Sequence, residues 1–103
     1  MAVIIRGTTP TIKYTFKTVD IETITRAILT IKKNGSIIVR KELSEATIGE
    51  DTLSWKLSQA DTLAGSREGA KVMLNWLTTD GTRGASSEVD VSFRDNHIPE
   101  VIA

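Results

Sequence analysis

The segment Thr11-Ile12-Lys13-Tyr14-Thr15-Phe16-Lys17 alternates between polar and apolar side chains along most of its length. This period of two predicts a β-strand, because successive side chains of a strand point to opposite faces of its sheet. The segments 53–57 and 89–94 show the same alternation. Each strand therefore has one apolar and one polar face, which is typical of an antiparallel sheet with one face in water.

The composition favours strands in the rest of the chain as well. Isoleucine, valine and threonine account for 33 of the 103 residues, and their branched side chains pack well on a pleated sheet. Isoleucines recur at helical spacing in 21–33, but β-branched residues disfavour a helix there, and we predict a turn around 19–23 followed by a strand. The only helix that we predict is a short turn at 58–63, opened by Ser58. Further strands are predicted at about 2–6, 25–32, 36–43 and 70–78.

The Asn34-Gly35 turn decides how the strands around it pair. If these two residues alone closed the turn, Leu29 would lie opposite Arg40, and the apolar sets of the two strands would point to different faces. A three-residue loop, 33–35, with a left-handed Gly35 in a bulge instead sets Leu29 opposite Val39. Both apolar sets then share one face, so we predict the three-residue loop.

A second turn signal, Asp80-Gly81, joins two other strands. Here a two-residue loop gives the consistent register. It sets the large Trp76 opposite the small Ala85, and Val72 opposite Val89.

About seven short strands with hairpin turns predict an all-β fold: a single immunoglobulin-like antiparallel β-sandwich over residues 1–103, with one short helical turn near 58–63. A small barrel is the alternative. Trp55 and Trp76 fall in step with the apolar residues of their strands, so both are expected to point into the core. The length of 103 residues fits one domain, and no linker or repeat divides the chain.

The composition excludes several classes of chemistry. The chain has no cysteine, and its one histidine, His97, cannot form a multi-histidine zinc site within the chain. Thirteen basic residues balance thirteen acidic ones, which argues against a nucleic-acid or anionic-membrane partner. Glu88 and Asp90 share the polar face of one strand, and we interpret them as solvated carboxylates rather than a general-acid pair. We predict a protein that is not an enzyme and binds no metal or other cofactor.

The sequence also argues against a membrane partner. No apolar run approaches the roughly 18–20 residues of a membrane helix, and the segment 1–6 is too short for a signal-peptide core. The basic residues of 32–41 have no interleaved aromatic side chain to stack bases. We interpret them as a solvated sheet face that discourages edge-to-edge pairing.

Several apolar residues fall on faces that the alternation assigns to solvent. Met73 and Leu77 alternate with the inward residues of their strand, and the bulged register turns Ile28 and Ile38 outward as well. Single exposed apolar residues are normal, but a patch that combines these four would mark a protein–protein contact. Met73, Leu77, Ile28 and Ile38 are therefore the predicted interface residues, and the apolar end segment 97–103 is a further candidate for docking on a neighbour.

Three stretches carry a resemblance to known proteins: Arg6-Gly7-Thr8-Thr9-Pro10-Thr11, Leu29-Thr30-Ile31-Lys32-Lys33-Asn34-Gly35 and Leu53-Ser54-Trp55-Lys56-Leu57-Ser58-Gln59. They resemble short prophage-encoded proteins of Gram-positive bacteria. More loosely, the chain is similar to the N-terminal β-sandwich module of phage baseplate upper proteins. The resemblance spans nearly the whole chain and consists of strand and turn patterns, without a catalytic or binding residue to carry over.

The resemblance implies a virion structural protein, a small phage tail or baseplate component that is assembled in the bacterial cytoplasm. Its partners would be other virion proteins or further copies of itself in a homo-oligomer. The alternative is a carbohydrate- or receptor-binding β-sandwich module, which would need an exposed aromatic platform or a metal site.

Overall fold

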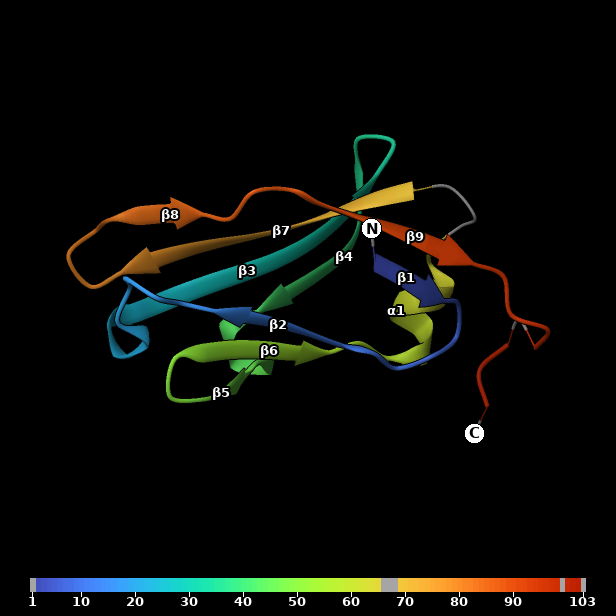
Figure 1. The fold of residues 1–103 in the computed structure, drawn as a ribbon, viewed down its shortest axis with the longest axis horizontal. Helices are drawn as coiled ribbons and strands as arrows, with labels where there is room; N and C mark the ends of the chain where they lie inside the picture. The colour runs from blue at the N-terminus through green and yellow to red at the C-terminus, as the bar shows by residue number, and fades with distance from the viewer. Residues whose placement is uncertain (1, 66–68, 99, 103) are drawn as a thin grey trace.

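The computed structural model describes residues 2–65, 69–98 and 100–102, which form two β-sheets packed against each other (Figure 1). The larger sheet has the strand order β1-β9-β7-β3-β4, with β8 paired to the end of β7, and the smaller sheet has the order β2-β6-β5. The strands are β1 (Ala2–Ile5), β2 (Thr11–Thr15), β3 (Ile24–Lys33), β4 (Ser36–Glu42), β5 (Thr47–Ile48), β6 (Thr52–Lys56), β7 (Gly69–Thr78), β8 (Arg83–Ala85) and β9 (Val89–Arg94).

This architecture confirms the predicted all-β sandwich. Strands β9, β7, β3 and β4 form one layer and β2, β6 and β5 the other, which is the strand arrangement of an immunoglobulin-like sandwich. The short strands β5 and β8 add to the seven that we predicted. One pair departs from the antiparallel pattern: β1 runs parallel to β9, from Ala2 beside Val91 to Ile5 beside Arg94.

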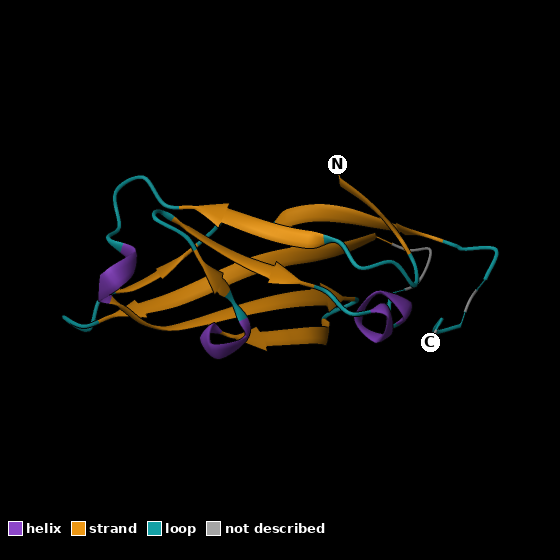
Figure 2. Ribbon diagram, turned by 90° about the horizontal axis from the view of Figure 1, so that it is seen from below, coloured by secondary structure: helices purple, strands orange, loops and turns teal. Residues whose placement is uncertain are grey.

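Three short helical segments connect the strands: η1 (Ile21–Thr23), η2 (Leu43–Glu45) and α1 (Gln59–Leu63). Figure 2 shows them at the margins of the strands. α1 confirms the predicted helical turn: Ser58 Oγ accepts a hydrogen bond from Asp61 N–H at 3.1 Å, and Asp61 Oδ2 accepts one from Ser58 N–H at 2.8 Å. η1 forms the predicted turn before β3, whereas η2 was not predicted.

The core lies between the two sheets and contains residues from both. Leu29 of β3, Leu74 of β7 and Leu53 of β6 are fully shielded from solvent. They belong to one cluster of buried side chains, against which partly buried residues such as Tyr14 of β2 pack. The alternation in the sequence therefore predicted correctly which face of these strands points inward.

The β3–β4 turn contradicts the predicted three-residue loop. Asn34 and Gly35 have positive φ angles of 50° and 80°, and they close a two-residue turn of the type in which both residues are left-handed. Further along β4 the pairing shifts by one position at a β-bulge, which sets Ile31 opposite Val39 and Leu29 opposite Lys41. A bulge, rather than a longer loop, therefore brings the apolar residues of both strands to one face.

The β7–β8 turn contradicts the predicted two-residue loop. Thr78 N–H donates to the carbonyl four residues further on at 3.0 Å, and Gly81 is the left-handed residue of the three-residue loop between them, with a φ of 84°. The longer loop shifts the pairing, so Trp76 lies opposite Gly84 rather than Ala85. A Cβ on Gly84 would lie 2.3 Å from Trp76 Cε2, so only glycine leaves room for this indole.

The predicted pair of Val72 and Val89 is present nevertheless, because the chain leaves the ladder between β8 and β9 and then returns to it. In that stretch Ser86 bonds twice to β7: its N–H donates to Leu74 O at 2.8 Å, and its Oγ accepts from Leu74 N–H at 2.9 Å. This detour compensates for the shift that the longer loop introduces.

Candidate interaction surface

Three of the four predicted interface residues lie together on the outer face of the large sheet. Met73 and Leu77 alternate along β7 with residues that pack in the core, and Ile28 does the same on β3. In the ladder Ile28 lies opposite Asn75, which is between Met73 and Leu77 along β7. All three apolar residues are partly exposed. Their predicted outward orientation is confirmed.

Ile38 is placed differently from the prediction. It is the additional residue of the β-bulge in β4, and it packs against the buried core beside Val39. A bulge changes the direction of side chains on the strand that carries it, which the assumed loop did not include. The predicted outward orientation of Ile38 is therefore wrong.

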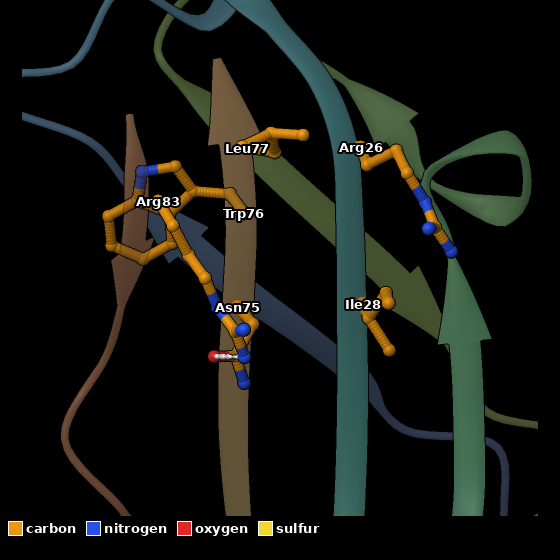
Figure 3. A pocket seen from close by; sticks show the side chains of 6 residues that line it. All are labelled: Arg26, Ile28, Asn75, Trp76, Leu77 and Arg83. Atoms are coloured by element: carbon orange, nitrogen blue, oxygen red, sulfur yellow. Dashed lines mark hydrogen bonds between the residues drawn. The ribbon is translucent and has the colours of Figure 1, made fainter. Parts of the chain in front are cut away.

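A hollow of about 310 Å³ lies on the outer face around Leu77 (Figure 3). The side chains that line it come from three neighbouring strands: Arg26, Ile28, Asn75, Trp76, Leu77 and Arg83. Arg26 of β3 and Arg83 of β8 lie opposite Leu77 on its two sides. An apolar floor is thus flanked by two guanidinium groups. Sequence reasoning missed both arginines, although the alternation in 24–33 already marks Arg26 as outward.

Positively charged side chains outnumber negatively charged ones around the hollow. Arg26 Nη2 and Arg40 Nη2 lie 3.3 and 3.4 Å from the same oxygen, Glu42 Oε1. Arg83 Nη2 donates a hydrogen bond to the uncharged Asn75 Oδ1 at 3.3 Å. Two arginines therefore share one carboxylate and the third contacts a neutral amide, so arginines outnumber acidic groups on this part of the face. Exposed ion pairs of this kind contribute little to stability, so the arginines remain available to a partner's carboxylates.

Trp76 borders the hollow, and it points toward the core as predicted but is only partly buried. Its ring makes an edge-to-face contact with Phe16, with ring centroids 5.1 Å apart and an interplanar angle of 89°. Trp55, by contrast, is 1% exposed. Trp55 therefore offers no surface to a ligand, whereas the partly exposed Trp76 does.

A second hollow, of about 370 Å³, lies where β1 and β9 of the large sheet approach β2 of the small sheet. Its lining is mostly apolar and consists of Val3, Ile4, Pro10, Thr11, Ile12, Lys13, Tyr14, Val72, Val89 and Val91. Burial raises the pKa of the Tyr14 hydroxyl, and a hydrogen bond with Ser86 partly offsets this effect. Val3 and Val89 remain about half exposed, at 51% and 47%. The sequence did not predict this hollow, because it forms between the edges of two sheets.

Of the two carboxylates that the sequence placed on one strand face, Asp90 lies within β9 and Glu88 precedes its first residue. Asp90 Oδ1 lies 2.6 Å from Lys71 Nζ across the β7–β9 ladder, and this contact lowers the pKa of Asp90 and raises that of Lys71. Glu88 and His97 are exposed. Within 2–65, 69–98 and 100–102, no cluster of three metal-ligating side chains occurs.

The basic residues of the β3–β4 hairpin, which we interpreted as one solvated sheet face, divide between its two faces. Arg40 contacts Glu42 on the outer face, whereas Lys41 Nζ lies 2.9 Å from Asp61 Oδ2 and joins β4 to α1. The side chains of this second pair are only 19% and 18% exposed. Burial alone would raise the pKa of Asp61, but hydrogen bonds from Ser58 and Lys41 hold it below its usual value.

Comparison with protein-family models found no match to this chain, and comparison with curated protein sequences found none either. No helix in the described part of the chain is long and apolar enough to cross a membrane. What the outer face can bind is therefore inferred from its own geometry and charge.

Proposed function

We propose that this chain is a non-enzymatic structural protein of a phage or prophage particle, a tail or baseplate component that acts through protein–protein contacts. The observation that carries the proposal is the group of outward apolar side chains, Ile28, Met73 and Leu77, on one face of the large sheet. The resemblance of three sequence stretches to prophage-encoded proteins supports the same role. On this proposal the chain is located in the virion after assembly in the bacterial cytoplasm.

The outer face of the large sheet is suited to a specific contact because its central strands cannot move independently. β7 and β3 each have hydrogen-bonded neighbours on both sides, so the positions of Met73, Leu77 and Ile28 are fixed relative to one another. Complete burial of one such side chain contributes about 1.5–3 kcal/mol to an association. Three of them beside charged groups resemble the apolar centre and polar rim of ordinary protein interfaces.

A carbohydrate- or receptor-binding module is the second candidate, and one observation favours it. The partly exposed Trp76 borders a hollow that also contains Arg83 and Asn75, and an aromatic ring with a few polar groups is typical of ligand sites. Tryptophan fluorescence during titration with sugars separates the two functions. Quenching that disappears in Trp76→Phe, while Trp55 still reports a folded core, would favour ligand binding.

The assembly proposal is tested by co-expression with the tail proteins that neighbouring genes encode, followed by sedimentation. The unchanged chain is expected in the assembled fraction, and the double variant Met73→Asp/Leu77→Asp is expected to be lost from it. Ile37→Asp is the matched control, because it changes a 54% exposed isoleucine of β4 that lies outside the hollow. Absence of the unchanged chain from every assembly, or full incorporation of the double variant, would contradict the proposal.

A further inference from the structure

We propose that the hollow around Leu77 binds the β5–β6 turn, residues 48–51, of a second copy of this chain. An apolar side chain of the turn enters the hollow, and two carboxylates face the arginines at its sides. This inference rests on the proposed function, because it names a partner for the same surface.

The β5–β6 turn carries one exposed apolar side chain and two carboxylates, which complement the apolar and basic lining of the hollow. Ile48 is 59% exposed, and Glu50 and Asp51 at the tip of the turn are exposed as well. No ion pair joins either carboxylate to another residue of the described ranges. Gly49 N–H donates across the turn at 2.9 Å, and Phe16 N–H donates to Asp51 O at 2.8 Å. The turn is thus a fixed projection with one apolar and two acidic side chains.

Charge and size agree between the two surfaces. Two arginines, Arg26 and Arg83, line the hollow, and the turn carries two carboxylates. Glu42 pairs with Arg26, whereas Arg83 contacts only the uncharged Asn75 among the lining residues. A volume of about 310 Å³ is at the small end of ligand sites, which suits one or two side chains rather than a cofactor. Arg26 and Arg83 belong to strands on either side of β7, so their backbones are roughly 10 Å apart. This separation leaves room for a branched side chain between the two ion pairs.

The arrangement of the sheets requires the contact to join two copies. The turn belongs to the small sheet, and the outer face of the large sheet points away from it (Figures 1 and 2). A chain therefore cannot fill its own hollow. Each contact uses a different surface on each copy and leaves one hollow and one turn free, so repetition produces a ring or a filament. The net charge of zero means that copies do not repel one another at long range.

Light scattering behind a sizing column, over roughly a hundredfold range of protein concentration, tests this contact. The mass of the unchanged chain should increase with concentration at low salt and decrease near 0.5 M salt, where charges are screened beyond roughly 4–5 Å. A turn variant, Glu50→Arg/Asp51→Arg, and a hollow variant, Arg26→Glu/Arg83→Glu, should each associate at least about tenfold more weakly. All four substituted side chains are exposed, and circular dichroism checks that each variant is folded.

Light scattering of a mixture of the turn variant and the hollow variant is the decisive test. The hollow variant keeps an intact turn, and the turn variant keeps an intact hollow, so an equimolar mixture should regain association. The control Lys56→Glu/Glu100→Arg reverses two exposed charges elsewhere and should associate like the unchanged chain. A mixture that stays monomeric, or single variants that associate normally, would overturn the contact. A strict monomer at every concentration would overturn self-association and leave the proposed virion role to the separate co-expression test.

Discussion

Trp55 and Trp76 occupy the same kind of position in the alternation of their strands, yet they are buried to different depths. Trp55 lies on β6, the central strand of the small sheet, where it is 1% exposed and its Nε1 donates to Glu42 O at 3.0 Å. Trp76 lies on β7 beside the short strand β8 and is only partly buried. The alternation of a strand determines the face to which a side chain points. The strands on either side determine how deeply that side chain is buried.

The largest expected effect comes from removing each indole. Trp55→Ala should lower the free energy of unfolding by about 3–5 kcal/mol, because it leaves a cavity in a closed core and removes a hydrogen bond. Trp76→Ala should lower it by about 2 kcal/mol or less, because part of this ring is already in water. Urea unfolding monitored by far-UV circular dichroism measures both. Equal losses would contradict the different burial of the two indoles.

Two glycines allow a second comparison between a buried aromatic ring and a partly exposed one. A Cβ on Gly65 would lie 2.4 Å from Cδ1 of Phe93, whose ring is 1% exposed, and a Cβ on Gly84 would lie 2.3 Å from Trp76. Gly65→Ala should cost about 2–3 kcal/mol, since the buried ring has nowhere to move. Gly84→Ala should cost about 1 kcal/mol, since Trp76 can shift toward solvent.

Tryptophan emission distinguishes the two glycine variants without unfolding them. Gly84→Ala should shift the emission of the native protein to longer wavelength, because Trp76 moves into water. Gly65→Ala should leave the emission unchanged, because the three atoms closest to the added methyl group all belong to Phe93 and not to an indole. A shifted emission in the Gly65 variant would mean that a change at Phe93 is transmitted to an indole.

Two ion pairs differ in exposure in the same way as the two tryptophans. Lys41 and Asp61 form a pair that is mostly shielded, whereas Lys71 and Asp90 form a pair that is more than half exposed. Lys41→Ala should lower the free energy of unfolding by about 1 kcal/mol, and Lys71→Ala should have a much smaller effect. The pKa of Asp61 is lowered in the folded chain, so its contribution is present above the usual value of 3.8 and is lost as the pH falls below it. The free energies of unfolding of the Lys41→Ala variant and of the unchanged protein should therefore converge as the pH is lowered, which urea unfolding at a series of pH values measures.

The smallest effect concerns the turn that places β8 beside Trp76. Hydrogen bonds from the Thr78 hydroxyl and from Thr82 N–H, the latter at 2.9 Å, hold the pKa of Asp80 at about 2, below its usual 3.8. The contribution of this carboxylate is present above 3.8 and is lost as the pH falls through about 2. NMR titration should give that midpoint, and Thr78→Val should raise it. A midpoint near 3.8 in the unchanged chain would mean that the turn is open in solution.

The two glycine turns show how far the sequence predicts this fold. Strand positions followed from alternation, and both turns were located correctly, but the loop lengths were exchanged. Asn34 itself adopts a left-handed φ, which permits the two-residue turn, whereas Asp80 leaves the left-handed φ to Gly81. In each hairpin a later irregularity, a bulge in β4 and a detour at Ser86, returns the apolar residues to the core. A rule that expects perfectly regular strands therefore selects the wrong loop.

The candidate site was predictable only in its apolar part. Met73 and Leu77 follow from alternation within β7, which needs no knowledge of pairing, whereas Ile28 was assigned to the outer face through the assumed β3–β4 register. The contribution of Arg83 depends on the β7–β8 register, since it lies opposite Leu77 only with the longer loop. Ile38 failed for the same reason, because the bulge changes the side to which it points.

The parallel pairing of β1 with β9 has a mechanical consequence. When chain segments before β1 and after β9 are pulled apart, the two strands are drawn in opposite directions along their length. Every hydrogen bond from Ala2 to Ile5 is then loaded at once, together with the bonds from Arg6 N–H to Arg94 O and from Asn96 Nδ2 to Arg6 O, both at 2.9 Å. A pull applied through the open edge of β4 would instead separate the β3–β4 bonds one after another. Single-molecule pulling should therefore require a higher force in the first geometry than in the second.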